Sequence, residues 1–376
     1  MRNFVKMFLS SGRKLPRTVK KLISPVSSAF DFENSLKGDV WSNKFEESAP
    51  CTTVYWLVHD FLNSCILKDG KAITKDGKTA KVLFLGYDGM RADMARCIAE
   101  RKNAFDCSEN SVTYSGIKDV MKNGGLYLAY CGGETGTNTQ QVTSTSAGWA
   151  AQFTGVWGVD NGVDSNNDTK NMNHLTFLTE YAKLGLSVSL NFDWSPFFDI
   201  NLYPEVKYAM EHPEMKLTYC DTSKKKCITA PSGSKVSAEF INFTAPKVTP
   251  DALLGDAVVR DYVLKRIEDG DDIVCGIYDG IDGAGHKFEF SPKCREYASA
   301  ALLCDIYSHQ VTEIIKEREK NLNEEWLIVF SNDHGGKGKG HGGQSLEERT
   351  VWIATNKPVS TKFLGKNYNG KTEMHE

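Results

Sequence analysis

Six short runs of β-branched and aromatic residues, separated by helical patterns, are the feature that most constrains the fold of this 376-residue chain. Each run is almost continuously apolar, as expected of parallel strands that are covered by helices on both faces. Helical spacing of apolar residues is clearest at 250–268 and 292–319. We therefore predict an α/β fold with an open, mainly parallel central sheet and helices on both faces. The predicted strands are 81–88, 125–131, 186–192, 273–279, 326–331 and 350–355.

Pattern changes along the chain predict three regions. Residues 1–80 form a weakly patterned N-terminal extension, apart from an expected helix at 53–67. Residues 81–376 form the main domain. Within it, residues 203–249 hold several prolines, a lysine run and an expected strand at 235–243, which predicts a small insertion that caps the edge of the sheet.

Charge and hydropathy exclude some classes of function. The formal net charge is −3, which argues against binding to nucleic acid duplexes. No segment approaches the ~18 consecutive apolar residues of a membrane span. The first 25 residues carry seven Lys or Arg and no acid, which is typical of a solvated terminus, or alternatively of a surface helix in weak contact with anionic lipid. These residues do not resemble a signal peptide, so we expect a cytoplasmic location. Nothing in the sequence predicts the oligomeric state.

The ten cysteines are scattered without a CxxC pair. In a chain of this length they are typical of reduced, mostly buried thiols in a cytoplasmic protein. Cys220 and Cys227 bracket a polar loop and would be able to pair in an exported protein.

Acids and histidines follow the predicted strands at the point where each strand ends. The carboxyl ends of parallel strands meet at one edge of a sheet, where ligands bind. Taken singly, each residue has a structural alternative, as a helix cap or part of a solvated loop. Together, three carboxylates and three imidazoles predict a site for two divalent cations. The candidate ligands are Asp88 at the end of 81–88, Asp282 and His286 in a glycine-rich turn, and Asp333, His334 and His341 after 326–331.

A hydroxyl cluster, TSTS at 143–146, precedes a short expected helix at 147–153. The positive end of a helix favours an alkoxide nucleophile and an attached phosphate. The alternative is an ordinary Ser/Thr cap. The later GKGKGHGG stretch lacks the GxxxxGK[ST] pattern of a nucleotide-binding loop.

The order and spacing of these motifs resemble the alkaline phosphatase superfamily, most closely its type I phosphodiesterase/nucleotide pyrophosphatase branch, over residues 81–355. The DGMR motif places Asp88 at the family's metal-binding position and Arg91 three residues later. The family's nucleophile lies nine residues before a Thr-Gly pair, and that spacing selects Thr145. The branch also has a glycine and a phosphate-binding Asn further on, which correspond to Gly162 and Asn166.

The resemblance implies an alkaline phosphatase-like fold and two metal sites. One site would consist of Asp282, His286 and His341, and the other of Asp88, Asp333 and His334. Zinc is the usual metal of the branch, with manganese as an alternative. The implied activity is hydrolysis of a small-molecule phosphate ester, at a phosphodiester or nucleotide pyrophosphate bond, through a covalent phospho-threonine intermediate.

Departures from the family pattern leave other activities open. Ile277 stands where the classical phosphatases have a Glu for a third metal, which disfavours a dedicated monoesterase. The CxPSR motif of sulfatases is absent from the sequence. The alternatives are a phosphomonoesterase, a phosphonate hydrolase, a phosphotransferase or mutase, and a non-catalytic metal-binding scaffold. The natural substrate is not predicted by the sequence.

Overall fold

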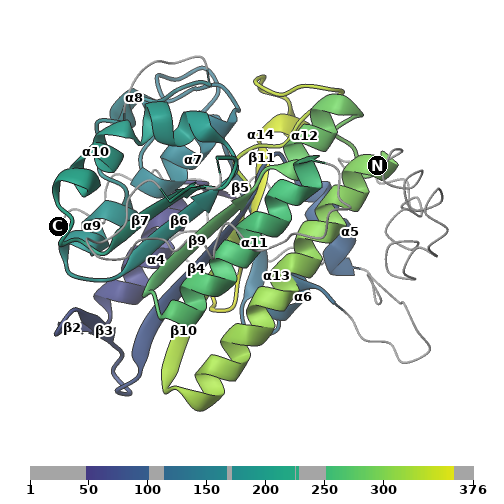
Figure 1. Cartoon of the computed structure of the whole chain (residues 1–376). Coiled ribbons are helices and arrows are strands. Elements are labelled where there is room, and N and C mark those ends of the chain that lie inside the picture. The colour runs from purple at the N-terminus through teal and green to yellow at the C-terminus, as the bar shows by residue number, and fades with distance from the viewer. Residues whose placement is uncertain (1–47, 101–113, 167–171, 225, 228–250, 360–376) are drawn as a thin grey trace, which may run out of the picture.

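A computed structural model describes residues 48–100, 114–166, 172–224, 226–227 and 251–359 (Figure 1). The basic segment 1–25 and the expected strand at 235–243 lie outside these residues. Among the described residues, no helix is long and apolar enough to cross a membrane.

The centre of the molecule is a mixed but mostly parallel sheet of eleven strands. Its main path runs in the order β1-β5-β11-β10-β4-β9-β6-β7-β8, with the β2–β3 hairpin joined to β4. All six predicted strands are present, so the predicted fold class is confirmed. The strands are β1 (Ala49–Pro50), β2 (Ile66–Lys68), β3 (Lys71–Ile73), β4 (Thr79–Tyr87), β5 (Gly125–Tyr130), β6 (Val188–Phe192), β7 (Leu217–Asp221), β8 (Lys226–Cys227), β9 (Ile273–Tyr278), β10 (Glu324–Ser331) and β11 (Thr350–Thr355).

One of the six predicted strands runs in the opposite direction. β11 pairs antiparallel with both β10 and β5, whereas its composition suggested a parallel strand. The reason is the path of the connection, residues 332–349, which stays at the edge where β10 ends. The N–H groups of Gly335 and Gly336 donate to the carbonyls of Glu348 and Glu347 in helix α14, so β11 starts at that edge and runs back along β10.

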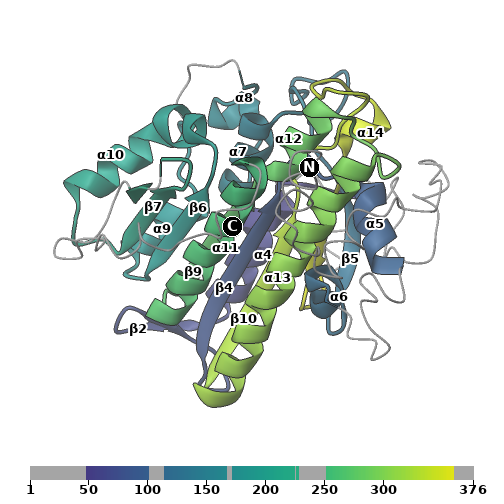
Figure 2. The same ribbon diagram turned by 45° about the vertical axis from the view of Figure 1, so that its right-hand side comes forward.

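Helices cover both faces of the sheet. Figure 1 shows α11 and α13 crossing in front of the strands, and Figure 2 shows the same pair from a direction turned by 45°. One apolar core lies between the sheet and α4, α7 and α9, and a second lies between the sheet and α5, α6, α11 and α13. The helices are α4 (Thr53–Asn63), α5 (Ala92–Glu100), α6 (Gly116–Met121), α7 (Thr145–Thr154), α8 (Gly158–Asn161), α9 (Phe177–Lys183), the π-helix η2 (Phe197–Asn201), α10 (Tyr203–Glu211), α11 (Asp251–Asp269), α12 (Gly280–Lys287), α13 (Arg295–Asn321) and α14 (Leu346–Arg349).

The register of the central strands brings three strand ends to one level. β4 pairs in parallel with β10 and with β9. Ser331 at the end of β10 lies opposite Gly86, and Tyr87 at the end of β4 lies opposite Tyr278 of β9. The segments that follow these strands therefore emerge side by side at the carboxyl edge of the sheet.

The N-terminal extension and the region 203–249 both contribute strands to the central sheet. In the N-terminal extension, β1 pairs with β5, and α4 packs its buried Val54 and Leu57 into the first core. In the region 203–249, β7 extends the sheet beside β6. The division of the chain at residue 80 and the capping role of 203–249 stay predictions.

Cys220 of β7 and Cys227 of β8 form a disulfide. The sequence favoured reduced thiols, but the antiparallel pairing of β7 and β8 places these two residues directly opposite each other. The seven other cysteines that the structure describes are free thiols.

Candidate metal centre and nucleophile

The end of β4 supplies the first carboxylate. Asp88 is completely buried directly after the strand, and Gly89 follows with a φ of +66°. The Gly89 N–H donates to Oδ1 of Asp333 at 3.0 Å, and a Cβ on Gly89 would lie 2.7 Å from Oδ1 of Asp282. Glycine is required here because the backbone turns in the left-handed region and passes directly against two carboxylates.

The end of β10 supplies an acid and an imidazole. Asp333 and His334 are completely buried, and Asn332 before them holds the turn in place. The Asn332 side chain accepts from the Trp352 N–H at 2.9 Å and donates to the His334 carbonyl at 2.9 Å. The buried turn therefore fixes both side chains relative to the sheet.

Asp282 and His286 lie on a helix. The glycine-rich sequence suggested a turn, which is wrong: residues Gly280–Lys287 form α12. Spacing of four puts both side chains on one helix face, with His286 Nε2 3.3 Å from Asp282 Oδ2. Gly285 in this helix serves packing, since a Cβ there would lie 2.4 Å from the Phe290 ring.

Each of the three imidazoles is oriented by a backbone carbonyl. Nδ1 of His334 lies 2.7 Å from the Gly335 oxygen, that of His341 lies 2.8 Å from the Thr143 oxygen, and that of His286 lies 3.0 Å from the Lys339 oxygen. A carbonyl only accepts, so each Nδ1 carries a proton, and in the neutral form of each ring Nε2 is left with its lone pair. This is the usual arrangement of histidines that bind a metal through Nε2.

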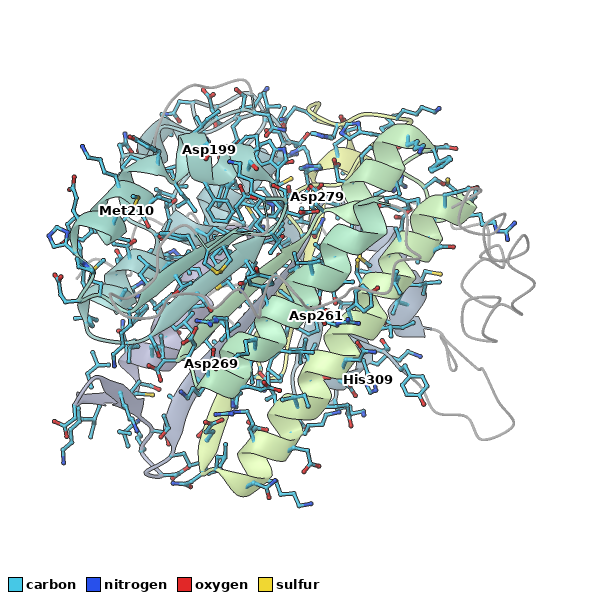
Figure 3. All side chains as sticks on the ribbon, in the orientation of Figure 1. Asp199, Met210, Asp261, Asp269, Asp279 and His309 are labelled. Carbon is cyan, nitrogen blue, oxygen red and sulfur yellow. A yellow bond between two sulfur atoms is a disulfide. The ribbon has the colours of Figure 1, made fainter. Side chains whose placement is uncertain are left out.

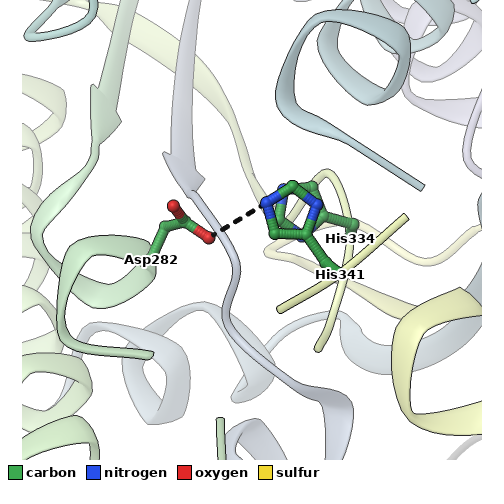
Figure 4. Close-up of side chains that lie close together, drawn as sticks. All are labelled: Asp282, His334 and His341. Atoms are coloured by element: carbon green, nitrogen blue, oxygen red, sulfur yellow. Dashed lines mark ion pairs between the residues drawn. The ribbon is translucent and has the colours of Figure 1, made fainter. Parts of the chain in front are cut away.

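The Nε2 atoms and the carboxylates converge on one place. His341 Nε2 lies 3.1 Å from His286 Nε2 and 3.8 Å from Asp282 Oδ1. Figure 4 shows the Asp282 carboxylate facing the rings of His334 and His341, which stack with centroids 3.9 Å apart. Lone pairs that face one another at these distances require a proton or a metal ion between them.

The other carboxylates approach His334 from the sheet side. Its Nε2 lies 3.2 Å from Asp333 Oδ2 and 3.6 Å from Asp88 Oδ1. Within the described part of the chain, Asp333 Oδ2 and Asp282 Oδ1 are buried and accept no hydrogen bond. Buried carboxylate oxygens without a donor are the positions at which a cation would be coordinated.

The electrostatics of the cluster also favour a cation. Burial, together with the nearby carboxylates of Asp333 and Asp282, raises the pKa of Asp88 well above its usual value, and burial does the same for Asp333. Burial lowers the pKa of His334 to about 3, which keeps the imidazole in its neutral, ligating form. The hydrogen bond to Asp282 raises the pKa of His286 to about 9, so a proton competes with a metal for this Nε2.

All six predicted ligands therefore lie together at the carboxyl edge of the sheet. Their atoms form two groups that could each hold an ion, Asp88–Asp333–His334 and Asp282–His334–His341, with His334 common to both. His286 lies within reach of the second group through Asp282 and His341. Imidazole nitrogens and carboxylate oxygens are ligands that suit divalent metal ions.

A third group of potential ligands, Asp119, His309 and Glu313, lies far from this edge. Figure 3 labels His309 on α13, well below Asp279 at the start of α12. The ammonium groups of Lys316 and Lys122 occupy Asp119 Oδ1 at 3.0 and 3.1 Å. This group is an ion-pair network that fastens α6 to α13, and its lysines exclude a cation.

The hydroxyls at the start of α7 have different partners. Ser144 is the N-cap residue, and Thr145 begins the helix. The Thr145 hydroxyl lies 3.5 Å from Asp88 Oδ1 and 3.4 Å from His334 Nε2. The Ser146 hydroxyl points elsewhere and donates to Asn201 at 2.8 Å. Of the hydroxyls of Thr145 and Ser146, only that of Thr145 faces the metal ligands.

Two residues of the family pattern have other partners in the structure. Asn166 Oδ1 accepts the Ser146 N–H at 2.7 Å, so the amide that was expected to bind phosphate bonds to the first turn of α7. Arg91 donates to Asp93, to the Phe290 carbonyl and to the Gly336 carbonyl, and so joins the loops beside the site.

Sequence reasoning missed Trp149, whose indole N–H donates to Asp88 Oδ2 at 2.9 Å. Its position four residues after Thr145 was the available signal, because that spacing puts both side chains on one face of α7.

Comparison with known proteins gives structural neighbours only. No protein-family model matches the chain, and no curated protein matches it in sequence. Phosphonoacetate hydrolase from Sinorhizobium meliloti 1021, in complex with phosphonoformate, is similar with a TM-score of 0.47 and 15% identity over 70% of this chain; the match spans 59% of that protein. Alkaline phosphatase from the Antarctic bacterium TAB5 is similar with a TM-score of 0.43 and 13% identity, over 76% of this chain and 93% of that one. The 2-O GAG sulfatase BT1596 is similar with a TM-score of 0.44 and 13% identity, over 74% of this chain and 64% of that one.

Proposed function

We propose that this protein is a metal-dependent hydrolase of phosphate esters, acting on phosphodiester or nucleotide pyrophosphate bonds through a covalent phospho-threonine at Thr145. The observation that carries the proposal is the position of the Thr145 hydroxyl. Thr145 begins helix α7, and its hydroxyl faces Asp88 and His334. The six predicted ligands lie beside it, from the completely buried Asp88, Asp333 and His334 to the exposed His286.

The residues divide into two sets for two divalent ions, zinc or alternatively manganese. Asp88, Asp333 and His334 would hold one ion beside Thr145, and Asp282, His286 and His341 would hold the other. When bound, such ions lower the pKa of a coordinated hydroxyl and neutralise charge that develops on phosphate oxygens.

Thr145 is the nucleophile in this proposal. Its hydroxyl gives up a proton, which passes through solvent to the departing oxygen, and Oγ1 attacks phosphorus as the bond from phosphorus to the leaving alcohol or phosphate breaks. Water then cleaves the bond between Thr145 and phosphorus, which releases the phosphorylated product and restores the hydroxyl. The N-terminus of α7 favours the negative charge on Oγ1 in both steps.

Asn166 and the Ser146 N–H hold the equatorial oxygens of the substrate. They bond to each other in the structure, so the substrate would exchange one hydrogen bond for two. Ile277, at the position of the phosphatases' third-metal Glu, is completely buried in the apolar core. This supports a diesterase over a dedicated monoesterase.

Initial rates on bis(p-nitrophenyl) phosphate and p-nitrophenyl phosphate test the proposal, measured after loading with zinc or manganese. We expect a metal-dependent preference for the diester that is lost in Thr145→Ala and kept in Ser146→Ala. A preference for the monoester would replace the diesterase assignment by a phosphatase or mutase. Metal binding without turnover of either ester would contradict an enzymatic role.

A further inference from the structure

One face of helix α7 is built against the metal ligands. Thr145, Gly148, Trp149 and Gln152 follow at spacings of three and four, which puts them on a single face. All four are completely or almost completely buried. This face meets the carboxyl ends of β4 and β10, where Asp88 and Asp333 lie.

Trp149 contacts the oxygen of Asp88 that the metal cluster does not use. The indole N–H donates to Oδ2 at 2.9 Å, whereas Oδ1 is the oxygen near Thr145 and His334. A hydrogen bond to one carboxylate oxygen fixes the plane of the group and aims the other oxygen. Trp149 therefore orients Asp88 toward the centre.

The indole ring is itself held in place. Gly86 of β4 makes room for it, since a Cβ there would lie 2.5 Å from the ring. Phe84 packs edge-on against the ring with centroids 5.9 Å apart, and Phe153 packs at 6.3 Å. In this packing the direction of the N–H is set by the core and not by the carboxylate.

The same helix is fastened to β10. Gln152 Nε2 donates to the Asn332 carbonyl at 2.8 Å, one residue before Asp333. Gly148 allows close approach, because a Cβ there would lie 2.6 Å from the Asp333 carbonyl oxygen. α7 thus contacts both carboxylate-bearing strand ends and also carries Thr145.

We propose that Trp149 is a positioning residue for the metal centre: it sets the orientation of Asp88 and, through α7, ties that orientation to the place of the Thr145 hydroxyl. The inference rests on the metal centre of the proposed function. The simpler alternative is that Asp88 only satisfies a buried indole N–H, as buried tryptophans generally require.

The test is the metal affinity of Trp149→Phe, which removes the N–H and keeps an aromatic ring. Stepwise dissociation constants for zinc are measured by competition with a chromogenic chelator. Loss of an outer partner of a metal ligand typically weakens binding about 10- to 100-fold. We expect a weakening of at least about tenfold at one of the two sites, with the other changed by less than about threefold.

Trp326→Phe is the matched control. Trp326 is also completely buried, and its indole N–H also donates to a carboxylate at 2.9 Å, that of Glu324 at the opposite end of β10. Its zinc affinities should equal those of the unmodified protein. Unchanged affinity in Trp149→Phe, or equal weakening at both sites, would overturn the inference alone. A native protein that binds no divalent ion would overturn the proposed function with it.

A measurement on the native protein covers the case in which Trp149→Phe does not fold. The chain has seven tryptophans, so ¹⁵N-labelled indole groups give seven N–H resonances. Addition of zinc should shift at least one indole resonance and leave that of Trp326, assigned from Trp326→Phe, in place. If no indole resonance moves as zinc binds, Trp149 does not sense the metal centre and the inference fails.

Discussion

Replacement of Gly148 by alanine should disturb the metal centre without unfolding the protein. The new Cβ would lie 2.6 Å from the Asp333 carbonyl oxygen and 2.7 Å from its Cβ, whereas ordinary contact begins at 3.4 Å. Either α7 or the end of β10 therefore has to move by about 0.8 Å. Metal–ligand distances tolerate only about 0.2 Å, so Asp333 cannot keep its place in the site.

The effect on folding should be smaller. Alanine is favoured over glycine within a helix by about 1 kcal/mol, and overpacking costs about 1–3 kcal/mol. The free energy of unfolding should thus fall by no more than about 2 kcal/mol, a fraction of the ~5–15 kcal/mol typical of a folded domain. Zinc affinity should fall by at least about tenfold.

Chelator competition measures the zinc affinity, and urea unfolding of the metal-free protein measures the stability. Gly283→Ala is the control: it makes the same change in a helix beside another predicted ligand, Asp282, where a Cβ meets nothing within 4 Å. The control should bind zinc normally. Normal zinc affinity in Gly148→Ala would refute this reasoning. It would show either that Asp333 is not a ligand or that the backbone accommodates the new Cβ without moving the Asp333 side chain.

Three further outcomes are expected. Thr145→Ser should keep the rate of metal-dependent hydrolysis within about tenfold, whereas Thr145→Ala should lower that rate by at least about 10³-fold. Ser146→Ala should lower it by less than about tenfold, and equal losses in Thr145→Ala and Ser146→Ala would contradict Thr145 as the nucleophile. Burial raises the pKa of Asp305 to about 7, so the folded state keeps a proton that the unfolded state releases near pH 4. Stability should therefore fall by about 1.4 kcal/mol per pH unit between about pH 4 and 7 from this group, and urea titrations of Asp305→Asn should lack that slope. Lys81 and Asp272 form a buried ion pair at 2.8 Å, so Asp272→Ala should lower the free energy of unfolding by about 3–5 kcal/mol. Urea unfolding measures this change, and a decrease of less than about 1 kcal/mol would show that the ion pair does not stabilise the fold.

The strands and the main helices were predictable because their signals are local. Near-continuous apolar runs mark strands that are covered on both faces, and the ends of the six runs lie within two residues of the ends of strands in the sheet. The direction of β11 was not predictable, because it depends on the path of the connection 332–349 and not on composition.

Glycine misled the prediction around Asp282. Three glycines in GIDGAGH suggested a turn, but the segment is helix α12. Gly285 is there because the Phe290 ring packs directly on it, a tertiary reason that overrides helix propensity. Local composition cannot distinguish a glycine that permits a turn from one that permits close packing.

The convergence of the candidate ligands was predictable from strand ends, but their partners were not. The sequence indicates that Asp88, Asp333 and Asp282 follow predicted parallel strands. It does not indicate that Trp149 holds Asp88 or that Asn166 bonds to the Ser146 N–H, since both contacts depend on how α7 sits on the sheet.

The most direct test of the central proposal is to trap the intermediate. Zinc-loaded protein is mixed with bis(p-nitrophenyl) phosphate, quenched with acid during turnover and mapped by peptide mass spectrometry. We predict the substrate's phosphoryl group on Thr145, absent from chelator-treated protein and from Thr145→Ala. Metal-dependent turnover with Thr145 unmodified, or with the group on Ser146, would contradict the proposed mechanism.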